Sequence, residues 1–456
     1  MKIFAENALL PEGWARDVTI TIEANGLIGR VDTGGGNLGG VRVPGPLVPG
    51  MPNLHSHAFQ RSFAGRTGRR NPDAQRGDSF WTWRAAMYAF LDRVDADAFE
   101  AITAQAYLEM LKAGYTSVAE FHYVHHDARG WAYADPAELA SRVVGASEAT
   151  GIGLTLLPVF YAHSGFGGAP PATAQRRFVH TLDSYARLVV ALAADAATRG
   201  YTLGVAAHSL RAVTPDELAA VIALASPAAP IHIHASEQGK EVADCIAALG
   251  MRPVEWLLDH AQIDGRWCVV HATHMTSAEI RRLAASGAVA GLAPTTEADL
   301  GDGTFAGRSY LEHYGVFGIG SDSNTQVDPF AELRQFEWSQ RLSRLERNVL
   351  ARGEVAVGQQ LWVMAAVGGS QALAQPVGAI ARGLRADLLV LNGDDPALAG
   401  QGVDDMLDAA IFGPCRQPVR DVMVAGRWVI RDGRHASEQA IFADYRAAMT
   451  RLAAAG

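Results

Sequence analysis

Cysteine and long apolar stretches are both scarce in this chain of 456 residues. The three cysteines, Cys245, Cys268 and Cys415, lie far apart, lack the spacing of a metal site and leave an odd count. This usage favours a reducing compartment over a disulfide-stabilised secreted fold. No window approaches about 18 uninterrupted apolar residues, and the N-terminus has no charged segment followed by an apolar one. We therefore expect no membrane span and a soluble, cytoplasmic protein.

Lysine is almost absent, and arginine supplies nearly all of the positive charge. Only Lys2, Lys112 and Lys240 occur among 39 basic and 48 acidic residues, and the net charge is −9. Because no basic run is present, nucleic-acid binding is not expected. The hydrophobic fraction of 49% supports a large buried core.

A pair of histidines near the start of the chain carries the first chemical signal. Residues 47–57 are an apolar run that ends in His55, Ser56 and His57. In a strand, residues i and i+2 point to the same face, so both imidazoles can reach one ion. An isolated His-x-His pair can equally be structural, and the later segments decide between the two interpretations.

Four later apolar runs also end in a residue with useful chemistry, namely His208, His234, His271 and Asp322. Helical patterns between them, such as residues 215–225 and 277–285, give an alternation of strand and helix that favours a parallel sheet. Candidate strands lie at about 47–52, 115–121, 152–160, 202–208, 230–234, 267–271, 288–293 and 316–321. We therefore predict an α/β fold, a (β/α)₈ barrel of the TIM type, with these residues at the carboxyl ends of its strands.

Both ends of the chain have a different character, with short β-type runs and no helical period in the first 46 residues. Comparable runs occupy residues 386–391 and 419–424, and a terminal helix is predicted at 438–455. The chain is also longer than a single barrel of about 250 residues. We predict that residues 47–376 form the barrel and that residues 1–46 and 377–456 together form a small β-sandwich domain with the terminal helix.

Several of these segments carry a resemblance to a known family. Residues 52–57, His234 with Glu237, His271 and Ser321-Asp322 resemble the amidohydrolase superfamily, within it the deaminases that hold one metal ion. Residues 54–61, 80–84, 120–126 and 208–211 more narrowly resemble the formimidoylglutamate deiminases. These enzymes hydrolyse N-formimino-L-glutamate to N-formyl-L-glutamate and ammonia in histidine degradation. The resemblance implies a hydrolase that acts on the C–N bond of a linear amidine, and by analogy a homodimer.

The predicted ligands of one divalent metal ion are His55, His57, His234 and Asp322. Imidazoles and a carboxylate suit zinc, although iron or another divalent ion could use the same donors. His234 is preferred to His232 because it lies nearer the carboxyl end of its strand, and His232 is predicted to be a core residue. Binuclear members of the superfamily bridge two metal ions with a modified lysine at a strand end. Here His208 ends the fourth strand, so a single metal ion is expected.

The predicted catalytic residues are Glu237, Asp322 and His271. Glu237 follows a ligand by three residues, where it can take a proton from water and pass it to the leaving nitrogen. Asp322 can bind the ion and also orient the same water. The alternative for Glu237 is a first-turn carboxylate that is favoured by a helix dipole.

By resemblance, the residues that bind the substrate are Gln60, Arg84, Tyr123, His208 and Arg211. Arginine binds carboxylates through two parallel hydrogen bonds, which suits a substrate with two carboxylates. The alternatives are that Arg84 only stacks on Trp81 or Trp83 and that Arg211 caps a helix.

Four further residues have weaker assignments. Arg61, next to Gln60, is a supporting cation, and His274 is either close to the substrate or an ordinary loop residue. His125 and His126 are predicted to lie at the surface.

Two other functions are alternatives to a deiminase. A guanine or cytosine aminohydrolase would need aromatic stacking and neutral hydrogen-bond donors, and the paired arginines count against it. A catalytically silent barrel that serves as a binding module is disfavoured because the ligand set and Glu237 are both intact.

Overall fold

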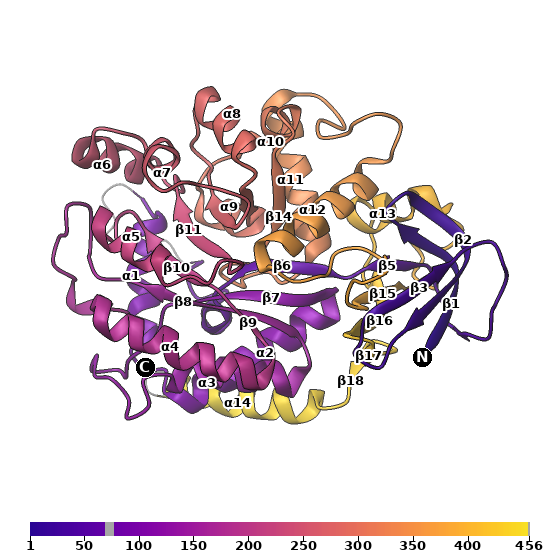
Figure 1. Ribbon diagram of the computed structural model, residues 1–456, viewed down its shortest axis with the longest axis horizontal. Coiled ribbons are helices and arrows are strands. Elements are labelled where there is room, and N and C mark those ends of the chain that lie inside the picture. Colours follow the sequence, from indigo (N-terminus) through magenta and orange to yellow (C-terminus); the bar gives the residue numbers. More distant parts are fainter. Residues whose placement is uncertain (69–76, 455–456) are drawn as a thin grey trace.

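The computed structural model describes residues 1–68 and 77–454. Figure 1 shows a barrel surrounded by helices on the left and a separate sheet, built from both ends of the chain, on the right. Within the described residues, the barrel strands are β6 (Met51–Ser56), β7 (Tyr115–His122), β8 (Gly153–Phe160), β10 (Val205–Ser209), β11 (Ile231–Ala235), β12 (Trp267–His271), β13 (Val289–Leu292) and β14 (Val316–Ile319). Neighbouring strands pair in parallel, with β9 (Thr202–Leu203) added beside β8. The predicted (β/α)₈ barrel is confirmed.

The barrel closes where its last strand meets its first. A parallel bridge joins Ser56, at the end of β6, to Asp322, which follows β14. The backbone N–H of Asp322 donates to the His55 carbonyl at 2.9 Å, and the N–H of His57 donates to the Asp322 carbonyl at 2.9 Å. Closure therefore brings the two ends of the barrel sequence together at the residues predicted to bind metal.

Two predicted strands are interrupted by glycine. Residues 47–52 divide into β5 (Leu47–Pro49) and the barrel strand β6, and residues 202–208 divide into β9 and β10. A Cβ atom on Gly50 would lie 2.3 Å from a side-chain carbon of Thr116, and one on Gly204 would lie 2.6 Å from the Pro230 carbonyl oxygen. These close approaches bend the chain within a continuous apolar run, and the run alone did not reveal them.

The second sheet combines both chain ends. Its strands are β1 (Lys2–Leu10), β2 (Gly13–Ile22), β3 (Ile28–Asp32), β4 (Val41–Arg42), β5, β15 (Leu388–Leu391), β16 (Val419–Val424), β17 (Arg427–Arg431) and β18 (Arg434–His435). β5 pairs with β1 on one side and with β15 on the other, which joins the two ends of the chain. Apolar side chains of β1, β2, β15 and β16 share one core, so the sheet folds over its own interior. The small β domain predicted from both ends is confirmed, while the division at residues 46/47 and 376/377 stays a prediction.

Local capping interactions mark where several helices begin and end. Thr214 and Thr276 accept hydrogen bonds from the backbone of Glu217 and Glu279, and these carboxylates reach back to form capping boxes. Left-handed glycines such as Gly114 and Gly151 follow the ends of helices.

The helices are α1 (Phe80–Leu91), α2 (Ala96–Ala113), α3 (Glu138–Thr150), α4 (Leu182–Arg199), α5 (Pro215–Ala223), α6 (Gly239–Leu249), α7 (Pro253–His260), α8 (Ser277–Ser286), α9 (Pro294–Leu300), α10 (Gly307–Glu312), α11 (Pro329–Arg344), α12 (Val357–Leu373), α13 (Val403–Phe412) and α14 (Glu438–Ala454), with short 3₁₀ turns η1 (Ala58–Phe63) and η2 (Thr173–Gln175).

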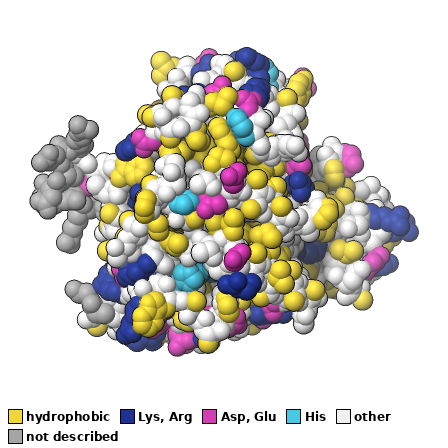
Figure 2. Space-filling model, turned by 60° about the vertical axis from the view of Figure 1, so that its left-hand side comes forward, with side chains coloured by type: hydrophobic (Ala, Val, Ile, Leu, Met, Phe, Trp, Pro, Cys, Tyr) yellow, Lys and Arg dark blue, Asp and Glu magenta, His cyan; other side chains and the backbone are white. Residues whose placement is uncertain are grey.

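The terminal helix α14 returns to the barrel and packs against α2, where Lys112 pairs with Glu438. Among the described helices, none is long and apolar enough to cross a membrane. Figure 2 shows charged side chains of both signs scattered among hydrophobic ones on the face that forms the left-hand side of Figure 1.

Gly320 tests the closure of the barrel. A Cβ atom at this position would lie 2.6 Å from the carbonyl oxygen and 2.8 Å from the amide nitrogen of His55. We expect Gly320→Ala to force the strand ends apart and lower the free energy of unfolding by about 1–3 kcal/mol, measured by denaturant titration. Gly393→Ala is the control, because a Cβ there meets nothing within 4 Å. Equal stability of the two variants would contradict this role for Gly320.

Candidate metal centre

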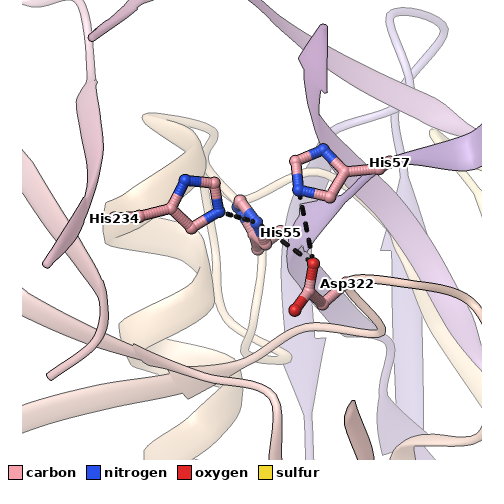
Figure 3. Close-up of side chains that lie close together, drawn as sticks. All are labelled: His55, His57, His234 and Asp322. Carbon is pink, nitrogen blue, oxygen red and sulfur yellow. Dashed lines mark hydrogen bonds and ion pairs between the residues drawn. The ribbon is translucent and has the colours of Figure 1, made fainter. Parts of the chain in front are cut away.

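Four buried side chains from three parts of the barrel converge at the carboxyl ends of its strands. His55 and His57 come from β6 and the residue after it, His234 from β11, and Asp322 from the segment after β14 (Figure 3). Each side chain offers one ligand atom, and these atoms all lie within 4.8 Å of one another. The Nε2 atoms of His55 and His234 are 3.0 Å apart, and Asp322 Oδ1 lies 3.5 Å from His55 Nε2 and 3.3 Å from His57 Nε2. The group can hold a metal ion.

The hydrogen bonds at the far side of two rings fix the tautomer that a metal needs. His57 Nδ1–H donates to the Phe121 carbonyl at 3.0 Å, and His234 Nδ1–H donates to the His208 carbonyl at 2.9 Å. A carbonyl oxygen only accepts, so each Nε2 atom keeps its lone pair for the centre. The donor set therefore fits a cation such as zinc, which binds imidazole nitrogen and carboxylate oxygen.

Burial and mutual repulsion keep the three imidazoles neutral. Burial is the main cause that lowers the pKa of His55, to about 3, and it also lowers the pKa values of His57 and His234. Burial alone would raise the pKa of Asp322, but the hydrogen bond to His55 and the positive charge of the neighbouring His271 bring that pKa below its ordinary value. The site therefore combines neutral nitrogen donors with an ionised carboxylate.

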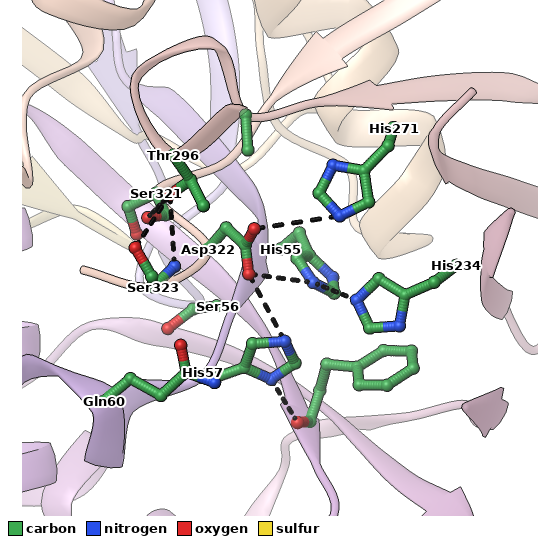
Figure 4. A network of polar contacts seen from close by, with 12 residues as sticks. His55, Ser56, His57, Gln60, His234, His271, Thr296, Ser321, Asp322 and Ser323 are labelled. Atoms are coloured by element: carbon green, nitrogen blue, oxygen red, sulfur yellow. Dashed lines mark hydrogen bonds and ion pairs between the residues drawn. The ribbon is translucent and has the colours of Figure 1, made fainter. Parts of the chain in front are cut away.

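His271 lies beside this group (Figure 4), and Glu237 in turn contacts His271. His271 Nε2 is 3.8 Å from Asp322 Oδ2 and 3.7 Å from Glu237 Oε1. Burial lowers the pKa of His271, but the charge of Glu237 and the hydrogen bond to Glu297 outweigh it, and the pKa rises to about 10. Burial raises the pKa of Glu237 to about 7 against the lowering effects of His271 and Arg211. A charged imidazolium thus faces a carboxyl group that can gain or lose a proton near neutral pH.

The residues expected to bind substrate lie around the same opening. Gln60 Nε2 donates to the Tyr123 hydroxyl at 2.9 Å, and both residues line a pocket with Arg84 and His208. Three of the four predicted ligands, His57, His234 and Asp322, line the same pocket. The volume of this pocket is about 40 Å³.

Arg211 is buried, with 7% of its surface exposed, and its Nη2 lies 3.7 Å from Glu237 Oε2. Its Nε has no hydrogen-bond partner among the described residues. Arg61, by contrast, pairs with Glu109 through Nε at 2.5 Å and does not line the pocket.

The sequence of this chain matches known protein families. Residues 47–429 match the amidohydrolase family, and residues 1–40 match the family described as formimidoylglutamate deiminase HutF, N-terminal domain. A formimidoylglutamate deiminase from Pseudomonas aeruginosa is 52% identical over 439 residues, which cover 96% of each chain. The chain belongs to the amidohydrolase family.

Solved structures share the whole fold of this amidohydrolase. The crystal structure of an amidohydrolase from Brucella melitensis superposes with a TM-score of 0.93 and 46% identity, and the match covers 99% of both chains. An adenosine deaminase from Xanthomonas campestris, described with bound zinc, has a TM-score of 0.83 at 21% identity and covers 99% of this chain and 98% of its own. The second likeness concerns the fold alone.

Sequence reasoning missed the carboxylates behind the ligands. Glu120 Oε1 accepts from the Ala58 amide at 2.7 Å and Oε2 accepts from the Tyr107 hydroxyl at 3.2 Å, which fixes the turn after His57. Glu297 Oε1 accepts from His271 Nδ1 at 3.2 Å and from the Ala293 amide at 3.0 Å. An acidic residue within an apolar strand is a usable signal for Glu120, whereas Glu297 has only its place in the first turn of α9.

Asn324 was also missed. Its Nδ2 lies 3.2 Å from Ser56 Oγ, 3.1 Å from the His57 carbonyl and 3.0 Å from the Asp322 carbonyl. One amide group thus ties the first ligand segment to the last.

Two of the other histidines contact backbone carbonyl groups. His232 is fully buried and lies 2.8 Å from the Ala372 carbonyl, as predicted for a core residue, and His274 Nε2 donates to the Asp302 carbonyl at 2.8 Å. The prediction that His125 and His126 lie at the surface is wrong. His125 is only 2% exposed and donates to the Val159 carbonyl, and His126 is half-buried. The loop after β7 turns inward there, and the adjacent polar residues gave no sign of it.

His122, His125, His126 and His180 form a buried histidine cluster in which successive rings lie 4.5–6.5 Å apart. Burial is the main cause that lowers all four pKa values, those of His122 and His180 to about 3. Because an unfolded imidazole has a pKa near 6.5, the unfolded chain binds more protons than the folded one below about pH 6.5, and acid favours unfolding.

We expect His180→Asn to weaken this loss of stability on acidification. Removing one buried imidazole reduces the slope of unfolding free energy between pH 6.5 and 4 by up to about 1.4 kcal/mol per pH unit. Urea titrations at several pH values measure the slope, and His313→Asn, at an exposed position, is the control. A slope equal to that of the unaltered protein would refute the prediction.

Proposed function

We propose that this amidohydrolase hydrolyses N-formimino-L-glutamate to N-formyl-L-glutamate and ammonia, the step of histidine degradation for which its Pseudomonas aeruginosa relative is named. The observation that carries the proposal is the buried Arg211, whose Nη2 lies 3.7 Å from Glu237 Oε2 and whose Nε has no hydrogen-bond partner among the described residues. A buried cation without a full set of acceptors is costly, and a carboxylate of the substrate would supply them. A homodimer and a cytoplasmic location stay predictions.

We assign one divalent metal ion, most simply zinc, to His55, His57, His234 and Asp322. Such an ion supplies Lewis acidity, which lowers the pKa of water and so provides a nucleophile at neutral pH. The residues around it then hold the substrate, orient the attack and move protons.

Glu237 is assigned the proton transfers. Its pKa of about 7 lets the carboxylate accept a proton from water as oxygen adds to the formimino carbon. The same group then donates that proton to the formimino nitrogen. The second proton of the water leaves the added oxygen as the carbonyl forms and passes through Asp322 to the same nitrogen, and the C–N bond breaks to give ammonia and the N-formyl product. The His271 imidazolium and the Asp322 carboxylate lie on either side of this path and stabilise the charges that develop there.

The two substrate carboxylates are assigned to the cations of the pocket. Arg211 and Arg84 each present a planar guanidinium that suits two-pronged binding. The same pocket is also lined by neutral groups that can form hydrogen bonds with the substrate, namely Gln60, Tyr123 and His208. A purine or pyrimidine needs none of this positive charge, and so the arrangement favours an acidic substrate.

The direct test is an ammonia-release assay on the zinc-loaded protein with three substrates, N-formimino-L-glutamate, guanine and cytosine. We expect turnover with the first alone, because the other two leave the arginines without a carboxylate. Faster release from guanine or cytosine would contradict the proposal in favour of a nucleobase aminohydrolase. Absence of release from all three would favour a binding role.

Glu237→Gln tests proton transfer. We expect kcat to fall by about 10²–10⁴, because an amide can neither accept the proton from water nor return it to the leaving nitrogen. Metal content, measured by mass spectrometry, should stay at the level of the unaltered protein. The exposed Glu354→Gln is the control and should keep normal turnover. Near-normal kcat in Glu237→Gln would remove this residue from the reaction.

Arg211→Met tests recognition of a carboxylate. A hydrogen bond to a charged group contributes about 1.5–3 kcal/mol, so we expect KM for N-formimino-L-glutamate to rise by about one to two orders of magnitude. Arg211→Lys should remain impaired, because lysine cannot form the two parallel bonds. The exposed Arg187→Met on α4 is the matched control. An unchanged KM in Arg211→Met would show that this cation does not hold the substrate.

A further inference from the structure

The indole side chain of Trp81 lies among three cations. The centroid of the Trp81 ring lies 4.5 Å from the guanidinium carbon of Arg84, 5.7 Å from that of Arg211 and 5.6 Å from Nζ of Lys240. These cations come from three separate elements, α1, the segment after β10, and α6. Three positive charges repel one another, and the negative face of an aromatic ring is a neutral group that attracts each of them.

Trp81 also lines a cavity outside the inner pocket. The residues of α1 that line the inner pocket, Phe80, Trp83, Arg84, Met87 and Tyr88, follow helical spacing on one face of the helix. Trp81 lies on the adjacent face and lines an outer cavity of about 460 Å³ together with Arg211, Lys240 and Asp244. Arg211 thus faces the outer cavity on one side and Glu237 on the other.

The inner pocket as it stands is too small for the proposed substrate. Its volume of about 40 Å³ holds only a few water molecules, whereas N-formimino-L-glutamate has about twelve non-hydrogen atoms. A ligand of that size therefore needs more space than the inner pocket offers, and we assign that space to the outer cavity, which Arg211 lines.

We propose that Trp81 is a positioning residue that determines specificity for acidic substrates. Its indole is the common platform that holds the side chains of Arg84 and Arg211 at the spacing at which each meets one carboxylate. Lys240 stacks on the same ring and adds positive charge on the solvent side, where it attracts an anion into the outer cavity. Asp244, which pairs with Lys240 at 2.5 Å, limits the net charge there. This inference rests on the proposed function.

The test compares Trp81→Leu and Trp81→Phe with the unaltered zinc-loaded protein on two substrates, N-formimino-L-glutamate and N-formiminoglycine, which has a single carboxylate. In Trp81→Leu we expect KM for the dicarboxylate to rise by about tenfold or more, with a smaller change for the monocarboxylate, kcat within a fewfold and unchanged metal content. Trp81→Phe keeps a smaller aromatic face, so its KM for the dicarboxylate should lie between those of the unaltered protein and Trp81→Leu, about threefold above the unaltered value. Trp131→Leu is the matched control, because Trp131 is 66% exposed and stacks on Arg129 alone at 5.7 Å.

Calorimetric measurement of the binding of N-formyl-L-glutamate, the product, distinguishes failure of the proposed function from failure of the inference about Trp81. If the unaltered protein neither binds this diacid nor releases ammonia, the proposed function fails. If the unaltered protein does both and Trp81→Leu has the same KM and affinity, the inference about Trp81 is wrong while the function stands. An equal rise in KM for both substrates, or a fall in kcat alone, would also overturn the inference about Trp81, because either result would indicate a general structural defect. Should Trp81→Leu not fold, the comparison of Trp with Phe decides, and an unchanged KM in Trp81→Phe contradicts the proposal.

Discussion

The last strand of the barrel meets the first at the metal group itself, and the arrangement of the site depends on this contact. Backbone hydrogen bonds link Asp322 to His55 and His57 in both directions. Residues more than 260 positions apart in the chain therefore become neighbours with fixed spacing, and Asn324 and Asn53 reinforce the junction with side-chain hydrogen bonds. Three of the four predicted ligands, His55, His57 and Asp322, thus belong to the barrel's closure.

Groups that lie only a few ångströms apart in the site differ in protonation state because their electrostatic surroundings differ. The three ligand imidazoles are neutral because burial makes their charged forms costly, while His271 is charged because acidic groups surround it. Glu237 lies between the cations His271 and Arg211 and has a pKa near neutrality. The same kinds of side chain thus act as metal ligand, charged stabiliser and proton carrier, and their surroundings decide which.

Much of the barrel could be predicted because its strands are short apolar runs that end in polar residues, and buried parallel strands favour this pattern. His55, His57, His234 and Asp322 were found as a group because each ends such a run. The breaks at Gly50 and Gly204 were not found, because they depend on close approaches to Thr116 and Pro230 from other parts of the chain. The same holds for Glu120, Glu297 and the inward-turned His125, whose partners are set by tertiary structure.

The most direct test of the account is a titration of metal-free protein with zinc, in which bound metal and ammonia release from N-formimino-L-glutamate are measured on the same samples. One buried group of four ligands predicts that activity is absent without metal and rises in proportion to bound zinc until one equivalent per chain. Equal activity in the metal-free protein, or activity that requires a second equivalent, would contradict it.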